Sequence, residues 1–168
     1  MGVDKATVDW LGVTAVDRVA ALAATAGAVP IFSVGGLPYG LPHVADETPG
    51  GGPVGGILAG AAVLRAAGCV RALVLAVDAP TLRLEDIQPL IASPGPGAVF
   101  EGLHLPMVVD LSALPVEARA DWPIGRLVDR AGLKRLECAD AARPRIRGAN
   151  TPLEREALLD RLREQEGA

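Results

Sequence analysis

The chain has 168 residues, of which 50% are hydrophobic, enough for one domain with a substantial core and too few for a second domain of ordinary size. Sixteen basic and twenty acidic residues give a formal net charge of −4, which excludes binding to nucleic acid polymers or anionic membranes through bulk charge. Only 3% of the residues are aromatic, so base-stacking platforms are also excluded. We therefore expect a single domain over residues 1–168 that acts on a small molecule, with no nucleic acid and no membrane among its partners.

The cysteines and the N-terminal composition indicate a cellular compartment. Cys69 and Cys138 have no CxxC spacing and no neighbouring histidine, so we expect two free buried thiols and neither a disulfide framework nor a zinc site. Charged side chains interrupt the first thirty residues, which argues against a signal peptide. No apolar run approaches the ~20 residues that a membrane-spanning helix needs. We expect a cytoplasmic protein.

The N-terminal half predicts two helices, two strands and two glycine-rich loops. Apolar residues share one face of a helix that Thr14 caps and Gly27 ends. The helix at 57–67 is apolar almost all round, which indicates burial on more than one side. The run at 70–77 is continuously apolar, as expected for an inner parallel strand covered on both faces. The predicted elements of this half are helices at 14–27 and 57–67, strands at 29–34 and 70–77, and loops at 35–42 and 46–56.

The C-terminal half continues this alternation. Two acidic residues begin a short helix at 85–91, where negative charge stabilises the helix N-terminus. Two strands are expected within 97–110, and Pro106 requires a sheet edge or a bulge there. Thr151 and Glu154 form a capping box for the terminal helix. The other predictions are a helix at 121–131, a strand at 133–138, and a helix at 152–163 with an inward stripe of Leu153, Ala157, Leu158 and Leu162.

Strands that alternate with helices of this length are typical of an α/β domain. We expect a three-layer sandwich in which helices cover both faces of a parallel or mostly parallel sheet.

Asp78 is the first candidate for a functional side chain. In an open α/β sheet, ligands bind at the carboxyl ends of the strands, and Asp78 directly follows the best predicted inner strand. The following Pro80 bends the chain away, so that the carboxylate faces the crevice. The alternative is a structural role in which Asp78 caps the turn through Thr81.

A second carboxylate precedes a glycine-rich loop that leads into a helix. Asp46 lies just before the run GGGPVGG at 50–56, where backbone N–H groups and a helix N-terminus can approach an anionic ligand. Mg²⁺ takes one or two carboxylates and fills its other positions with water and phosphate oxygens, which suits two loop-borne aspartates. Each feature alone is also ordinary turn chemistry.

Three other polar residues are open to a functional or a structural interpretation. Lys5 can place a point charge on a phosphate, although a lone lysine is usually a solvated surface residue. His43 and His104 have no partner at a useful spacing, so we interpret both as structural.

Taken in order, these features resemble the MobA-like nucleotidyltransferases, of which the molybdenum cofactor guanylyltransferase is the type. That family begins with a strand and the loop LAGGxSxR, followed by MGxDK. The similarity spans essentially the whole chain, and the four motifs MGxDK, GPxxG, VDxP and NTP are specific jointly rather than singly. The matching segments are MGVDK at 1–5, LG at 11–12, VDRV at 16–19, Asp46 with GPVGGI at 52–57, LVLAVDAP at 73–80, and NTPLE at 150–154.

The resemblance implies a mostly parallel, Rossmann-like sheet of the nucleotide-diphospho-sugar-transferase type and transfer of GMP from GTP to molybdopterin with release of pyrophosphate. It implies that Lys5 and Asp78 are catalytic, with Lys5 on the nucleotide phosphates and Asp78 on Mg²⁺, and that Asn150 lies near the pterin. The further nucleotide contacts that it implies are Ser33, Asp46, Gly52, Pro53, Gly55 and Gly56. The implied partners are GTP, molybdopterin and, transiently, proteins that mature molybdoenzymes.

The chain departs from the family pattern in two places. Ser33 stands by spacing where the family has an asparagine, which leaves open a cytidylyltransferase or another nucleotidyltransferase of the same superfold. Met1 coincides with the methionine of the family's MGxDK, so the first strand and its phosphate loop are missing. We expect the reading frame to extend upstream; the alternative is an inactive, shortened paralogue that binds pterin or nucleotide.

Overall fold

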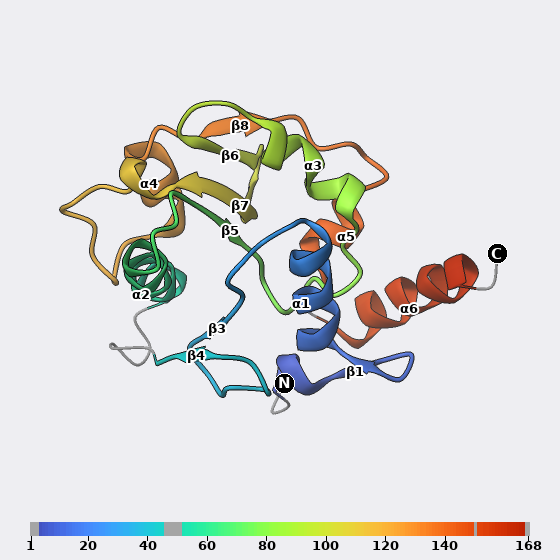
Figure 1. Ribbon diagram of the computed structural model, residues 1–168. Coiled ribbons are helices and arrows are strands. Elements are labelled where there is room, and N and C mark those ends of the chain that lie inside the picture. Colours follow the sequence, from blue (N-terminus) through green and yellow to red (C-terminus); the bar gives the residue numbers. More distant parts are fainter. Residues whose placement is uncertain (1–3, 46–51, 150, 167–168) are drawn as a thin grey trace.

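The computed structural model describes residues 4–45, 52–149 and 151–166, and it has a mixed α/β architecture with a four-stranded main sheet (Figure 1). In this sheet β5 and β6 each pair antiparallel with β7, and β6 pairs parallel with β8, so β5, β6 and β8 point the same way. The strand order is β5-β7-β6-β8. The strands are β5 (Arg71–Val74), β6 (Gly97–Phe100), β7 (Leu103–Asp110) and β8 (Lys134–Leu136).

Helices pack on both faces of this sheet, because successive residues of its central strands are apolar and point to opposite faces. Val99 and Met107 face one core cluster together with residues of α2 and α4, whereas Ala98 and Val108 face a second cluster together with residues of α3 and α5. The helices are α1 (Ala15–Thr25), α2 (Pro53–Ala66), α3 (Leu84–Ala92), α4 (Ile124–Arg130), α5 (Arg143–Arg147) and α6 (Pro152–Glu166). Within the described ranges, no helix combines the length and apolar character needed to span a bilayer.

β5 differs from its prediction. The sequence predicted an inner parallel strand over 70–77, but the ladder covers only Arg71–Val74, and β7 is its one partner among the described residues. Val70 is 80% exposed. The prediction of an inner strand is therefore wrong for the described sheet, because strand pairing depends on segments distant in sequence.

Pro106 lies in the central strand β7, where the sequence predicted a sheet edge or a bulge, and the strand pairing around it is interrupted. The pairing of β6 with β7 shifts register between Val99 and Phe100, next to the segment that contains Pro106. A proline has no N–H to donate to a ladder, so an interrupted register accommodates it.

The N-terminal segment forms two small sheets outside the main one. β1 (Asp9–Trp10) and β2 (Val13–Thr14) form an antiparallel hairpin, and β3 (Ser33–Val34) pairs parallel with β4 (His43–Val44). The predicted strand at 29–34 is thus reduced to two residues, and β4 was not predicted. β3 packs close to α2: a Cβ built at Gly60 would lie only 3.3 Å from the Val34 side chain.

Local capping signals gave accurate helix ends. Thr14 accepts a hydrogen bond from the Asp17 amide at the start of α1, and Thr151 accepts one from the Glu154 amide at the start of α6. α2 begins at Pro53 rather than at residue 57, since Gly52 caps it and proline suits a first helical position.

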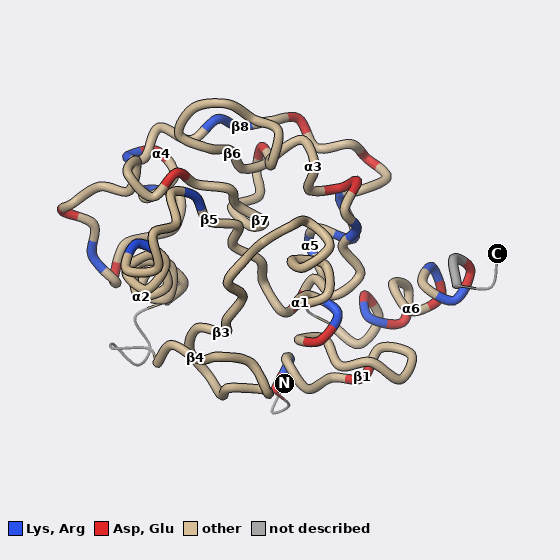
Figure 2. Tube along the Cα trace, in the orientation of Figure 1, with Lys and Arg blue, Asp and Glu red and all other residues tan. Residues whose placement is uncertain are grey.

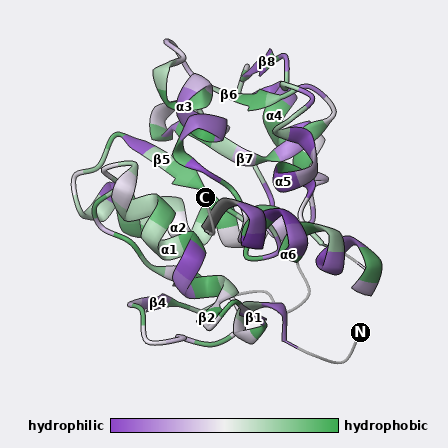
Figure 3. Cartoon of the chain, turned by 90° about the vertical axis from the view of Figure 1, so that its right-hand side faces the viewer, coloured by the Kyte–Doolittle hydropathy of each residue, from purple (hydrophilic) through white to green (hydrophobic). Residues whose placement is uncertain are grey.

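α6 covers the β1–β2 hairpin and shows a largely hydrophilic surface (Figure 3). Leu158 and Leu162 pack with Trp10, as the predicted inward stripe requires. Leu153 is 77% exposed and Ala157 is also exposed, so these two members of the stripe were predicted wrongly. The two cysteines are free; Cys138 is buried as expected, but Cys69 is only half-buried.

Candidate functional site

Asp78 lies in the turn that follows β5. Its neighbour Ala79 is only 2% exposed and anchors the turn in the core, whereas the Asp78 side chain keeps 32% of its surface exposed. Thr81 Oγ1 is buried and has no hydrogen-bond partner in the described part of the chain. With this exposure, the Asp78 carboxylate stays accessible to a ligand.

Lys5 lies against this carboxylate, although 73 positions separate the two residues in sequence. Lys5 begins a single 3₁₀ turn, Lys5–Thr7, which Asp4 caps by accepting a hydrogen bond from the Ala6 amide at 3.0 Å. Lys5 Nζ is 3.5 Å from Asp78 Oδ2, and the Lys5 side chain is 42% exposed. An exposed pair of this kind contributes at most about 1 kcal/mol to stability, so its value as a structural contact is small.

Tyr39 connects the glycine-rich loop after β3 to the 3₁₀ turn that carries Lys5. Tyr39 Oη donates a 2.7 Å hydrogen bond to Asp4 Oδ2, and this bond raises the pKa of Tyr39 above its ordinary value. Tyr39 also adopts a left-handed backbone conformation, with φ 50°. This contact could not be predicted from the sequence, because its two partners lie in segments without a periodic pattern.

A cavity of about 640 Å³ opens beside this pair. Its walls come from α1, α2, β3 and β5, together with the loops that follow β3 and β5. Asp4, Ala6 and Val77 line it, so the immediate neighbours of Lys5 and Asp78 form part of its rim. The predicted site residues that line it are Ser33, Gly52, Pro53 and Gly56, whereas Lys5, Asp78 and Gly55 are not among its lining residues.

The wall of the cavity around β3 carries no charge. No charged residue occurs between Arg18 and Asp46, and the β3–β4 region is correspondingly tan in Figure 2. Because the lining carries few charges, the ion pair at the rim provides the main local charges. The arrangement suits a ligand with an uncharged body and a charged end.

The N-terminus of α2 faces the same cavity. Gly52 adopts φ 78°, a conformation that favours glycine, and it offers no side chain to the first-turn N–H groups of α2. Gly52 and Pro53 are exposed. No side-chain hydrogen bond caps this helix end among the described residues, and a helix N-terminus of this kind suits an anion.

Ser33 and His43 form a pair that the sequence did not predict. The parallel pairing of β3 with β4 puts them opposite one another, and Ser33 Oγ lies 3.0 Å from His43 Nδ1. Ser33 Oγ also lies 3.3 Å from the Pro38 carbonyl oxygen. His43 therefore has a polar partner, contrary to the expectation from spacing, because a register between separate strands cannot be read from either strand alone.

Two of the predicted site residues, Asp46 and Asn150, lie outside the described residues. The residue before Asn150 is described: Ala149 donates its N–H to the Asp78 carbonyl oxygen at 3.0 Å. The C-terminal segment therefore reaches the Asp78 turn, which sequence reasoning did not anticipate.

The described residues contain no group of three or more His, Cys, Asp or Glu side chains suited to hold a metal ion. Mg²⁺ does not require such a group, since one or two carboxylates suffice when a nucleotide supplies phosphate oxygens. Asp78 is an accessible carboxylate beside a cavity of adequate size, so its donor chemistry fits a magnesium ion bound together with a nucleotide.

Comparison with known proteins places this site in a family. A family model described as the MobA-like NTP transferase domain matches residues 1–115, which include Lys5, the start of α2 and Asp78. No curated protein matches the chain at a significant level. The matched segment covers more than half of the chain, and the chain therefore belongs to the MobA-like NTP transferase domain family, whose general activity is nucleotidyl transfer.

Proposed function

We propose that the protein transfers GMP from GTP to molybdopterin and releases pyrophosphate. The observation that carries this proposal is the meeting of Lys5 and Asp78, 3.5 Å apart, at the rim of a cavity with few charged residues that the N-terminus of α2 also faces. A cation, a carboxylate and free backbone N–H groups around one space are the groups that bind and neutralise a nucleotide triphosphate.

In the proposed reaction, the terminal phosphate of molybdopterin attacks the α-phosphorus of GTP, a new P–O bond forms, and the bond to pyrophosphate breaks. The attacking phosphate is already ionised near neutral pH, so positioning and charge neutralisation suffice and no general base is needed. When bound, Mg²⁺ would neutralise charge on the phosphate oxygens, and Asp78 would hold it. Lys5 steadies negative charge on the nucleotide, and Asn150 contacts the pterin.

The nucleotide occupies the cavity in this proposal. Gly52, Pro53, Gly55 and Gly56 bring backbone close to its phosphates, and Asp46 lies next to this loop in sequence. Ser33 contacts the nucleoside, supported by its place in the cavity wall.

The cavity borders β3 and β5, and each of these strands is paired with only one strand in the described part of the chain. An unpaired strand edge exposes backbone donors and acceptors.

A transfer assay tests the proposed function. The full protein is incubated with molybdopterin, Mg²⁺ and GTP labelled at the α-phosphate, and the label is followed into a pterin dinucleotide while pyrophosphate is measured. We expect equal amounts of both products. Release of label as free GMP, or no labelled pterin at saturating substrate, would contradict the proposal.

Ser33 favours a second candidate, a cytidylyltransferase or another nucleotidyltransferase with a different base. A serine hydroxyl paired with His43 presents fewer hydrogen-bonding groups than the family's asparagine side chain, so guanine need not be the base. The same assay with CTP, UTP and ATP separates these activities. A tenfold preference for CTP over GTP would establish the cytidylyl alternative in place of the guanylyl one.

A further inference from the structure

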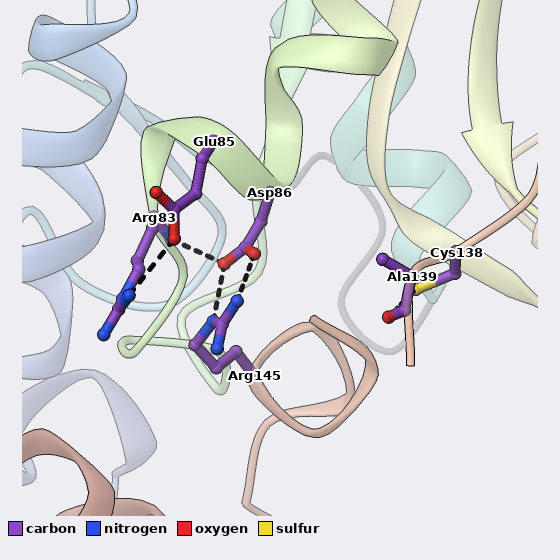
Figure 4. A network of polar contacts seen from close by, with 6 residues as sticks. All are labelled: Arg83, Glu85, Asp86, Cys138, Ala139 and Arg145. Carbon is purple, nitrogen blue, oxygen red and sulfur yellow. Dashed lines mark hydrogen bonds and ion pairs between the residues drawn. The ribbon is translucent and has the colours of Figure 1, made fainter. Parts of the chain in front are cut away.

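A buried ion pair joins α3 to α5. The Asp86 side chain is 2% exposed, and its Oδ2 atom accepts hydrogen bonds from the Arg83 amide at 3.0 Å and from Arg145 Nε at 2.8 Å. A terminal nitrogen of Arg145 binds the other carboxylate oxygen, so the guanidinium makes a two-pronged contact (Figure 4). The same contact raises the pKa of Arg145.

This pair fixes a helix that has little stability of its own. α5 has five residues, and helices of this length depend on tertiary contacts. Ile146 anchors one side of α5 in the core cluster around α3, and Arg145 anchors the other at Asp86. A planar, two-pronged contact fixes orientation as well as distance.

The chain that leaves α5 lies directly on the Asp78 turn. Gly148 has φ 64°, and a Cβ built there would lie 1.9 Å from the Asp78 carbonyl oxygen. The next residue, Ala149, donates its N–H to that same oxygen at 3.0 Å. The main chain of Asp78 is therefore held by the residues that immediately follow α5.

We infer that Arg145 is a positioning residue for the site: by holding α5 at Asp86, it holds Gly148 and Ala149 against the Asp78 main chain and so sets the direction of the Asp78 carboxylate. Arg145 is not among the residues that line the cavity, and it acts through the backbone. The catalytic consequence of this inference rests on the proposed function, whereas the structural coupling does not.

The coupling is tested by hydrogen exchange in the full chain. Under conditions where exchange reports the opening equilibrium, the Ala149 amide should lose at least about tenfold protection in Arg145→Ala, while amides of β6 and β7 change only with global stability. Arg145→Lys keeps the charge but not the two-pronged contact, and should give an intermediate loss. Arg130→Ala removes an exposed arginine paired with Glu117 and should leave the Ala149 amide unchanged.

Gly148→Ala disturbs the same contact with Asp78 but leaves the ion pair of Arg145 and Asp86 in place. It provides the test if Arg145→Ala, which leaves a buried carboxylate unpaired, fails to fold. The added methyl must displace Gly148 from Asp78. Gly132→Ala is its matched control, because Gly132 has φ 65° and no atom within 4 Å of the added Cβ. We expect Gly148→Ala, but not Gly132→Ala, to expose the Ala149 amide.

The kinetic readout separates positioning from general destabilisation. Arg145→Lys and Gly148→Ala should lower kcat about tenfold to a hundredfold, with the KM for the nucleotide changed less than about threefold, since small misplacement of a catalytic group costs that much. Unchanged Ala149 exchange in both variants would overturn the inference, whatever the activity. If the variants lose Ala149 protection but the wild type shows no nucleotidyl transfer, the coupling stands and the proposed function is overturned instead.

Discussion

The main sheet and the N-terminal wall of the cavity are both rich in apolar residues, yet they are packed differently. Ile87, Leu90 and Met107 are fully buried, because helices cover both faces of the sheet around β6 and β7. Phe32 in the cavity wall and Leu75 beyond β5 remain half-buried.

The cavity wall is therefore less closely packed than the core around the main sheet. Apolar side chains that line a cavity contribute less burial than the same side chains in a close-packed core. The less packed region includes the cavity proposed for the nucleotide, and it borders the edges of β3 and β5 that have no partner strand among the described residues.

The largest expected effect is on catalysis. Asp78→Asn should lower nucleotidyl transfer by at least about a thousandfold, as expected for loss of a metal-binding carboxylate, with little change in stability. Asp129→Asn is the matched control, because Asp129 is an exposed aspartate paired with Arg135 away from the cavity. Transfer retained by Asp78→Asn would remove Asp78 from the catalytic role.

The packing contrast is measured by a pair of leucine truncations. Leu90→Ala should destabilise the protein by about 2–5 kcal/mol, the usual cost of emptying a close-packed leucine site. Leu75→Ala should cost about 1 kcal/mol, because this side chain already borders the cavity. Chemical denaturation gives the free energy of unfolding of both variants. Equal losses of this free energy would show that the two regions are equally packed.

The two cysteines probe the same contrast chemically. Burial raises the pKa of Cys138, so less thiolate is present and access is poor. Cys69 is half-buried near the far end of α2 and should react with iodoacetamide at least about tenfold faster at neutral pH. Mass spectrometry of partly alkylated protein gives the ratio directly, and faster labelling of Cys138 would mean that the core around α5 opens readily.

The smallest effect is expected from an exposed ion pair on the surface, Arg130 with Glu117. Arg130 lowers the pKa of Glu117, so the pair stabilises the fold above the ordinary glutamate pKa and loses that contribution as the pH falls through the lowered value. Glu117→Gln should therefore be slightly less stable than the wild type at neutral pH and equally stable once the pH lies below the lowered pKa of Glu117. A difference that persists in acid would show that another contact is involved.

Short-range signals allowed much of the fold to be predicted from sequence. The caps at Thr14 and Thr151 are encoded within a few residues of where they act, and both are present. Pro106 likewise lies where the pairing of β6 with β7 shifts register. The site was accessible to prediction through Asp78, since an acidic residue after an apolar strand is a local pattern.

Features that depend on distant segments were missed or wrong. The edge position of β5 and the pairing of Ser33 with His43 follow from strand register, which no single segment determines. The contact of Ala149 with Asp78 joins residues 71 positions apart through a helix too short to be recognised from its sequence.

The thermal stability of the protein with bound nucleotide gives the sharpest test of a nucleotide site at Lys5 and Asp78. A ligand that binds only the folded protein raises its melting temperature, so GTP with Mg²⁺ should raise the Tm of the wild type and of Asp129→Asn but not that of Asp78→Asn. An equal rise in all three proteins, or no rise in the wild type with any nucleoside triphosphate, would contradict a nucleotide site organised by Lys5 and Asp78.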